Sequence, residues 1–410
     1  MKTLILSAIS ILCFPLAVTP AFAQAGHLDA TFGSGGVVAN APLTEFTAAA
    51  LAANGDIVVA GGIDGTAAIV RYLPSGALDP SFGTDGLLML PAPASFFLGE
   101  SFMLGIAVQT NGKILATFYA FNNTSTESET VLLRLNANGQ PDTTFGSGGQ
   151  VPLSFPVPAG WGASATLVLA QPDGKILVTG NIVPPFRNHS APLTLLARYL
   201  TNGALDTTFG TNGIEEVVAP VDLPSSLALL SGDGILPLND QGTIVVSQFS
   251  PSGAPVTPST GGTIIASDPT GTTAFQTNGD FLIAGTVAGP DGRLNVDATV
   301  ERFELNGVED PSFQPPTIRF GPDGADVKNA PAGVAVDSTG RVLVAAEFES
   351  STFGSGVARL NSNGSLDTTF GSAGIGALVP DFVVYAILVQ PDNKAIMVGS
   401  GGNLARYLAQ

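Results

Sequence analysis

The sequence is poor in the residues that cross-link small proteins and hold metal ions. Its 410 residues include one cysteine, one tryptophan and two histidines. The single cysteine, Cys13, excludes a disulfide within the chain, so a buried core must stabilise the fold, and a chain of this length can bury one. The two histidines, His27 and His189, are too few for a multi-histidine metal site.

Basic residues are also scarce. The chain has 15 lysines and arginines against 33 acidic residues, a formal net charge of −18. Nucleic-acid binding requires a basic stripe that neutralises phosphates. Outside the repeated positions described below, the basic residues are few and scattered: Arg187, Arg293, Arg319 and Lys328. We therefore expect no nucleic-acid partner, and we attribute the acidity either to solubility outside the cytoplasm or to a cationic ligand.

Long apolar runs are absent except at the N-terminus. Residues 1–23 have the features of a secretory signal peptide, with Lys2 at the start, an apolar stretch and a small-x-small site that ends at Ala23. The stretch is short and is broken by Pro15 and Pro20, which argues against a membrane anchor. The sequence predicts an exported protein, periplasmic or secreted, whose mature chain has no membrane span.

An eleven-residue motif recurs along the chain. Its clearest copy starts at Gly203 and reads GALDTTFGTNG. Further copies begin at Gly26, Gly76, Gly139 and Gly364, with a weaker copy at Gly307 and a degraded one at Gly253. Repeats with a period of about 50–60 residues indicate a propeller, a solenoid or an array.

Each repeat contains the signals of four short strands. An apolar stretch is followed by an Asn-Gly or Asp-Gly turn, such as Asn54-Gly55, which tolerates the positive φ angles of tight hairpins. A strand that ends in arginine, such as the one ending at Arg71, precedes the motif, and a short strand follows it. No helical periodicity is present. Four-stranded antiparallel units repeated around an axis are the blades of a β-propeller.

The repeats predict an all-β, seven-bladed β-propeller over residues 24–410, closed as a ring. The chain stops at Gln410, where the first unit would continue with Gly76, and the mature N-terminus supplies that continuation from Gly26. The N-terminal strand would then complete the last blade and leave no exposed sheet edge there. The expected blades are 43–93, 98–156, 160–222, 223–267, 268–322, 328–382, and 383–410 with 26–40.

Arginine and aspartate recur together, eight residues apart. The spacing holds in five units, and Arg406 with Asp29 would complete the set across the chain ends: Arg71 and Asp79, Arg134 and Asp142, Arg198 and Asp206, Arg302 and Asp310, Arg359 and Asp367. The fourth unit loses both partners, as Gln248 and Val256. This joint loss predicts a partly buried ion pair between strand and turn. Each aspartate could also cap its own turn.

These features resemble the delta-60 repeat family of bacterial secreted and surface proteins. The resemblance covers residues 26–410 and rests on the motif copies, on turns of the type Gln171-Pro172-Asp173-Gly174, and on strands of the type Ala197-Arg198-Tyr199. It implies a propeller-like repeat fold. It implies no particular reaction, and the repeated residues are expected to be structural, with the motif phenylalanines packed between blades.

A binding site is expected where the repeats differ. The turns between first and second strands and between third and fourth strands are uniform, and they share one face. The other connections vary, including insertions at 118–130 and 181–192, and they lie on the opposite face, where loops carry specificity. Candidate ligand-binding residues there are Glu100, Glu127, Glu129, Trp161, Arg187, His189, Asp222, Asp268, Asp297, Asp326 and Glu347. Trp161 could stack on a sugar or pack internally, and His189 fits a solvated loop better than a base.

No catalytic signature is present: there is no nucleophile elbow, zinc-protease motif, phosphate loop or EF-hand loop. We therefore expect a monomeric binding module, without a required cofactor, for a protein, a glycan or another extracellular polymer. The alternative is a hydrolase or lyase that uses carboxylates at the central opening as acid and base, with calcium bound there.

Overall fold

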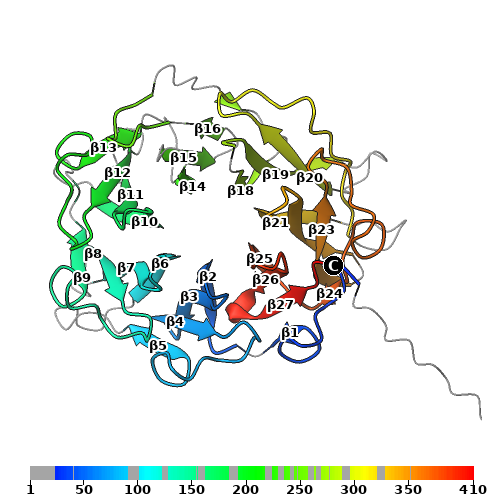
Figure 1. Cartoon of the computed structure of the whole chain (residues 1–410), viewed down its shortest axis with the longest axis horizontal. Coiled ribbons are helices and arrows are strands. Elements are labelled where there is room, and N and C mark those ends of the chain that lie inside the picture. Colours follow the sequence, from blue (N-terminus) through cyan, green and yellow to red (C-terminus); the bar gives the residue numbers. More distant parts are fainter. Residues whose placement is uncertain are drawn as a thin grey trace, which may run out of the picture.

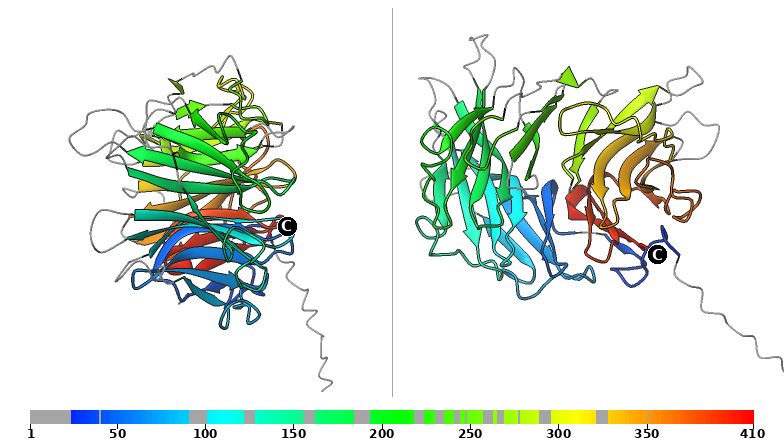
Figure 2. Two further views of the ribbon diagram at one scale, coloured as in Figure 1. Left: turned by 90° about the vertical axis from the view of Figure 1, so that its left-hand side faces the viewer. Right: turned by 45° about the horizontal axis from the view of Figure 1, so that its top comes forward.

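The structure, a computed structural model, describes residues 24–39, 41–90, 101–121, 128–153, 155, 162–183, 193–217, 224–229, 235–240, 244–246, 248–256, 263–264, 269–276, 278–288, 296–320, 328–350 and 352–410. These residues form short strands, tight turns and one 3₁₀ turn, so the fold is all-β. The sheets are arranged around a central opening (Figure 1). Figure 2 shows that the strands run through the thickness of the molecule, so their connections gather on two opposite faces.

Four sheets each contain four consecutive strands in antiparallel order. The first comprises β2 (Glu45–Leu51), β3 (Ile57–Ile63), β4 (Thr66–Tyr72) and β5 (Leu87–Leu90). The second comprises β6 (Ser101–Val108), β7 (Ile114–Phe121), β8 (Ser128–Leu135) and β9 (Gln150–Leu153). The third comprises β10 (Gly162–Ala170), β11 (Ile176–Val183), β12 (Leu193–Tyr199) and β13 (Ile214–Val217). The fourth comprises β14 (Pro224–Leu229), β15 (Ile235–Asp240), β16 (Ile244–Val246) and β17 (Thr263–Ile264).

A seven-stranded sheet follows. Its strands are β18 (Pro269–Phe275), β19 (Phe281–Ala288), β20 (Val296–Phe303), β21 (Lys328–Val336), β22 (Val342–Glu349), β23 (Phe353–Leu360) and β24 (Val379–Pro380). Its two parts meet at a single parallel bridge between Val296 and Lys328, whereas its other neighbours are antiparallel.

The fifth repeat differs from the four-strand prediction. Among its described residues it has three strands, and after them only an isolated bridge between Ala298 and Ile318. The motif here continues as Gln314-Pro315-Pro316 in place of the Gly-x-x-Gly turn. In an intact copy the Thr211 N–H closes the turn by donating to the Ile214 carbonyl at 2.7 Å. Pro315, at the equivalent position, has no N–H, which explains why no regular fourth strand forms among the described residues of this repeat.

The last sheet combines the two ends of the chain. Its order is β1-β27-β26-β25, with β1 (Val37–Val38), β25 (Val384–Val389), β26 (Ala395–Gly399) and β27 (Leu404–Tyr407), and the 3₁₀ turn η1 (Ser400–Gly402) precedes β27. Val37 faces Ala405 across the antiparallel pair. The Asp29 N–H also donates to the Arg406 carbonyl, at 2.8 Å.

The core lies between neighbouring sheets. In β3, six of the seven residues are buried, because the middle strands of a sheet are covered on both faces. One cluster joins the first sheet to the last, with Ile57 and Val59 packed with Ile396 and Val398. Adjacent sheets are therefore bound through apolar side chains, and the outer turns carry the repeated polar motif.

Candidate functional site

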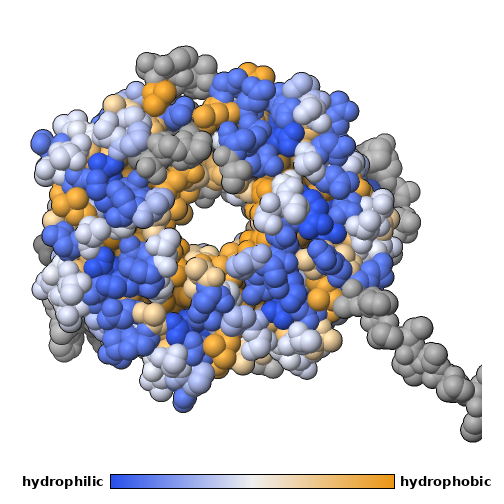
Figure 3. All heavy atoms as spheres, viewed as in Figure 1, coloured by the Kyte–Doolittle hydropathy of each residue, from blue (hydrophilic) through white to orange (hydrophobic). Residues whose placement is uncertain are grey.

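The wall of the central opening is made by the first strand of each repeat. These strands contact one another in sequence around the opening: β2, β6, β10, β14, β18, β21 and β25, with β25 again touching β2. Glu45 and Lys328 are their only charged residues. Figure 3 shows the opening edged largely by hydrophobic residues, with hydrophilic residues further out. The opening is thus a charge-poor surface in an otherwise strongly acidic protein.

Every wall strand is interrupted by an irregularity against its neighbour. The register shifts lie at Phe46/Ala48, Met103/Gly105, Ala165/Val168, Pro224/Ser226, Pro269/Thr272, Pro331/Gly333 and Val384/Ala386. A β-bulge turns a side chain out of the regular alternation and increases the local twist. The recurring irregularity therefore controls which side chains face the opening.

Two aromatic rings stack at this wall. Phe46, in β2, and Tyr385, at the irregularity of β25, have ring centroids 5.5 Å apart and planes that differ by 8°. Tyr385 remains 49% exposed, and Phe46 is half-buried. Both lie near the start of their strands, away from the turn at 52–56, and so at the end of the opening that the variable connections share. An exposed, preformed aromatic pair is a platform for a flat ligand.

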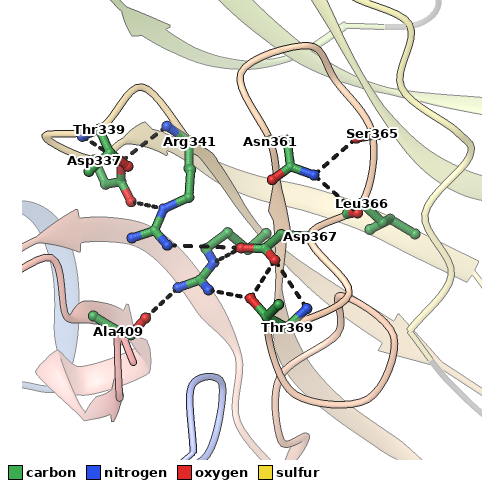
Figure 4. A network of polar contacts seen from close by, with 10 residues as sticks. Asp337, Thr339, Arg341, Asn361, Ser365, Leu366, Asp367, Thr369 and Ala409 are labelled. Carbon is green, nitrogen blue, oxygen red and sulfur yellow. Dashed lines mark hydrogen bonds and ion pairs between the residues drawn. The ribbon is translucent and has the colours of Figure 1, made fainter.

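The repeated arginines lie elsewhere, on the outer part of the opposite face. Figure 4 shows one such network. Arg359, only 2% exposed, donates from Nε to Asp367 Oδ2 at 2.8 Å and from a terminal nitrogen to the Ala409 carbonyl at 2.7 Å. Its guanidinium also lies 4.5 Å from the ring centroid of Phe370. Nearby, Arg341 Nε donates to Asp337 Oδ2 at 2.6 Å. Each of these charged side chains has several partners within the protein, which is typical of residues that stabilise the fold.

The same cluster recurs in the six repeats that keep both the arginine and the aspartate. The arginine stacks on the motif phenylalanine at centroid distances between 4.4 and 4.8 Å: Arg71 on Phe82, Arg134 on Phe145, Arg198 on Phe209, Arg302 on Phe313, Arg359 on Phe370 and Arg406 on Phe32. Each arginine also contacts its aspartate: Asp79, Asp142, Asp206, Asp310, Asp367 and Asp29, respectively. The aspartates also accept hydrogen bonds from the Ser or Thr two residues later, so pairing and turn capping coexist.

These contacts keep the aspartates ionised. Burial alone would raise the pKa of Asp29, but hydrogen bonding from Thr31 and Lys394 and the charge of Arg406 lower it to about 2. For Asp206, burial is likewise outweighed by Thr208, Lys175 and Arg198, and the pKa is about 2.

Most of the ligand-binding residues expected from the sequence lie outside the described residues. These are Glu100, Glu127, Trp161, Arg187, His189, Asp222, Asp268 and Asp326, and of Glu129 only the backbone is described. Two are described in full. Asp297 is buried and paired with Arg319, at 2.9 and 3.2 Å. Glu347, in β22, is half-buried, and burial raises the pKa of its carboxyl.

The aromatic pair was missed from the sequence. Three of the five tyrosines, Tyr72, Tyr199 and Tyr407, directly follow a repeat arginine and belong to the buried framework. Tyr385 has no place in the repeat, and an aromatic residue outside the repeat pattern was the available signal. The sequence does not predict that Tyr385 stacks on Phe46, because the two residues lie near opposite ends of the chain.

Neither a metal cluster nor a membrane helix is seen in the part of the chain that the structure describes. No group of three or more histidine, cysteine, aspartate or glutamate side chains there could hold a metal ion. No helix there is long and apolar enough to cross a membrane.

A family model matches four segments of the chain. It is described as "Domain of unknown function (DUF5122) beta-propeller" and matches residues 52–82, 109–145, 171–209 and 338–370. Each segment runs from near the first turn of a repeat to the motif phenylalanine. A search of curated proteins found no match.

Solved propeller structures are similar at low identity. The Dos1 propeller is 9% identical with a TM-score of 0.46, over 90% of this chain and 93% of that one. The WD40 propeller domain of Doa1 is 10% identical with a TM-score of 0.42, over 91% and 98%. A GH74 xyloglucanase from Xanthomonas campestris is 12% identical with a TM-score of 0.47, over 90% and 52%. The family model and the sheets arranged around the central opening show that the chain is a β-propeller domain.

Proposed function

We propose that the chain is a closed, seven-bladed propeller with the blade boundaries expected from the repeats. The pairing of β1 with β27 supports closure. The single bridge that joins β20 to β21 supports dividing the seven-stranded sheet into two blades. The seven wall strands that contact one another around the opening support the count.

The propeller acts as a binding module, and its ligand stacks on the platform formed by Phe46 and Tyr385. This exposed stacked pair, on a wall that is otherwise poor in charge, is the observation that carries the proposal. The ligand class that fits best is a neutral glycan, because a sugar ring offers a flat, weakly polar face and needs no ionic partner. The variable loops on the same face would add contacts to neighbouring sugar units.

Replacing Tyr385 tests this function. Neutral hexasaccharides, namely cellohexaose, maltohexaose and xylohexaose, are titrated into the mature protein by calorimetry. We expect at least one to bind, and Tyr385→Ala to weaken it about tenfold or more, because an aromatic anchor is a hot spot. Met89→Ala is the matched control, since Met89 is 39% exposed in the outer strand β5. Equal binding by the Tyr385 variant and the parent would rule out the platform.

An enzyme remains the second hypothesis, and one observation favours it. Burial raises the pKa of Glu347, which is the environment that a general acid requires. A hydrolase or lyase would need a second carboxylate or a calcium ion near the opening. A thermal melt with EDTA and then with added calcium tests for the ion, because a bound ligand stabilises the native state. The loss of polymer cleavage in Glu347→Gln would support the enzyme, and no cleavage by the parent would remove it.

Export, oligomeric state and family membership complete the proposal. Residues 1–23 are removed as a signal peptide, and the protein is periplasmic or secreted. The mature protein is a monomer without a nucleic-acid partner, and it belongs to the delta-60 repeat family. Mass spectrometry of the exported protein should give a chain that begins at Gln24, and light scattering should give the monomer mass.

A further inference from the structure

Each repeat arginine reaches beyond its own repeat. A terminal nitrogen of its guanidinium donates to a backbone carbonyl in a turn of the next repeat around the ring. Arg134 contacts the Thr201 carbonyl at 2.6 Å, and Arg359 contacts the Ala409 carbonyl at 2.7 Å (Figure 4). The other contacts of this kind are Arg71 with Ala137, Arg198 with Pro251, Arg302 with Ser362 at 2.7 Å, and Arg406 with Pro74. Six crevices between neighbouring repeats thus each hold the guanidinium group of an arginine.

One crevice lacks its arginine. Between the fourth and fifth repeats, Gln248 and Val256 replace the arginine and the aspartate. The backbone is nevertheless intact, because Val256 N–H donates to the Gln248 carbonyl at 2.8 Å, as Asp79 N–H donates to the Arg71 carbonyl at 3.0 Å. In the other crevices the acceptor carbonyl belongs to the residue three positions after the arginine position of the next repeat, which here is Leu305, three positions after Arg302. Within the described residues, no donor contacts it.

A cavity of about 540 Å³ lies at this position, lined by Gln248, Val256, Asp280, Glu304, Leu305, Asn306 and Asp310. Its size does not set it apart, because the crevice between the last and first sheets has about 490 Å³. The charge of its lining does set it apart. The crevice between the last and first sheets is lined by Lys394 and Arg406, whereas the cavity beside Gln248 has three carboxylates and no lysine or arginine among its lining residues.

The acidity of the cavity comes from the missing arginine at Gln248 and from an aspartate at a repeat position that is cationic in most repeats. The residue after the Asn-Gly or Asp-Gly turn is cationic in four other repeats and lies near the motif aspartate: Lys113, Lys175, Arg341 and Lys394. The first repeat also has an aspartate there, Asp56, which lies 3.9 Å from Arg71. Here the residue is Asp280, with Asn278 as its hydrogen-bond partner. Asp310 is already paired with Arg302, so Asp280 and Glu304 supply the uncompensated charge.

We propose that this cavity binds the guanidinium group of an external ligand. The ligand's terminal nitrogens donate to the Leu305 carbonyl, and Asp280 and Glu304 balance its charge. A guanidinium is the group that the six equivalent crevices already accept, and its planar fork suits a carbonyl and carboxylates together. The net negative charge of the protein favours the approach of such a cation. The site is on the motif face and does not depend on the aromatic platform.

Ethylguanidinium is the probe, and ethylammonium, with equal charge and no planar fork, is the control. Binding is measured by saturation-transfer difference NMR on the mature protein. We expect saturable binding of ethylguanidinium and weaker binding of ethylammonium. Asp280→Asn should weaken ethylguanidinium binding about two- to fivefold, the effect of losing one exposed ion pair. Acetyl-Gly-Arg-Gly-amide then separates two sources: tighter binding than ethylguanidinium indicates an arginine side chain of a partner, and weaker binding indicates a small guanidino compound.

Restoring the missing pair provides the decisive variant. In Gln248→Arg combined with Val256→Asp, the protein's own guanidinium should fill the cavity, abolish probe binding and raise the melting temperature. Asp280→Asn covers the case in which the double variant does not fold, because Asp280 lies at the surface. Equal binding of ethylguanidinium and ethylammonium by the parent, or an affinity unchanged in Asp280→Asn, would overturn the proposal.

Discussion

A repeat arginine connects three parts of the chain at once. Arg198 pairs with Asp206 at 2.8 Å, stacks 4.5 Å from the ring centroid of Phe209 and contacts the Pro251 carbonyl in the next sheet. A buried ion pair adds little stability over an apolar pair of equal shape, but losing one partner leaves the other charge uncompensated. The cluster therefore works as a set, which is consistent with the fourth repeat having lost both members together.

Breaking one pair tests this at the level of single residues. We expect Asp206→Ala to lower the free energy of unfolding by about 3–5 kcal/mol, because Arg198 would remain buried without its carboxylate. Urea denaturation of the mature protein measures the change. The control is Asp392→Ala, whose side chain is 55% exposed beside Lys394, and it should stay within about 0.5 kcal/mol of the parent. Equal stability of the two variants would contradict the pairing hypothesis.

The lowered aspartate pKa values predict acid sensitivity. Asp29 and Asp206 have a pKa of about 2 in the folded protein, against about 3.9 in an unfolded chain. The unfolded state therefore binds protons first, and the stabilisation is complete above about pH 4 and is lost as the pH falls towards 2. Urea denaturation at several pH values should show this decline. Asp206→Asn should flatten it, and a slope identical to the parent's would argue against a contribution from Asp206.

At the scale of single strands, one glycine positions the wall of the opening. Gly61 in β3 lies opposite Phe46, where β2 is irregular. A Cβ atom at Gly61 would lie 1.9 Å from the carbonyl oxygen of Glu45. The close approach of the two backbones thus requires glycine, and it holds the residues that begin β2, including Phe46 of the aromatic platform.

Adding a methyl group at this strand tests the close approach. Gly61→Ala should destabilise the protein by about 1–3 kcal/mol, as in overpacked cores. It should also weaken the binding of any ligand that stacks on Phe46. Gly62→Ala is the matched control one residue away. Its nearest contact would be the flexible Glu45 carboxylate at 3.3 Å, so little change is expected. Thermal melts of both variants measure the difference, and equal melting temperatures would mean that β2 moves freely away from β3.

Sequence reasoning at this scale succeeded for the turns and strands that the repeat specifies. It failed where a local substitution removed a hydrogen bond. The fifth repeat keeps Asp310 and Phe313, so its motif is recognisable, yet with Pro315 and Pro316 its described residues form no regular fourth strand. The outcome depends on backbone donors rather than on the hydrophobic pattern that identified the repeat.

At the scale of the whole molecule, the two ends of the chain meet in one sheet. Without β1, β27 would be an edge strand with unpaired backbone groups, which is a hazard for aggregation. The short pairing of Val37 with Ala405 is consequently a point at which the whole molecule can be stabilised or opened.

A disulfide across this pair tests the closure. Residues 24–410 contain no cysteine, so a chain of these residues with Val37→Cys and Ala405→Cys can form only one intramolecular disulfide. Facing residues of an antiparallel pair have the required spacing. We expect the oxidised variant to gain about 2–4 kcal/mol over its reduced form, because the bond closes almost the entire chain. Thermal melts with and without reductant measure this, and no difference would mean that the ends separate before the molecule unfolds.

The sequence by itself determined the all-β class, the repeat and the spacing of arginine and aspartate. Those features depend on turn geometry and on strands close together in the chain, which short-range patterns encode. Only the tertiary structure decided that each arginine reaches the next repeat, that Phe46 stacks on Tyr385, and that a cavity lined by Gln248 lies beside Leu305. These depend on the packing of one sheet against another, and no local pattern specifies which residues of distant segments will meet.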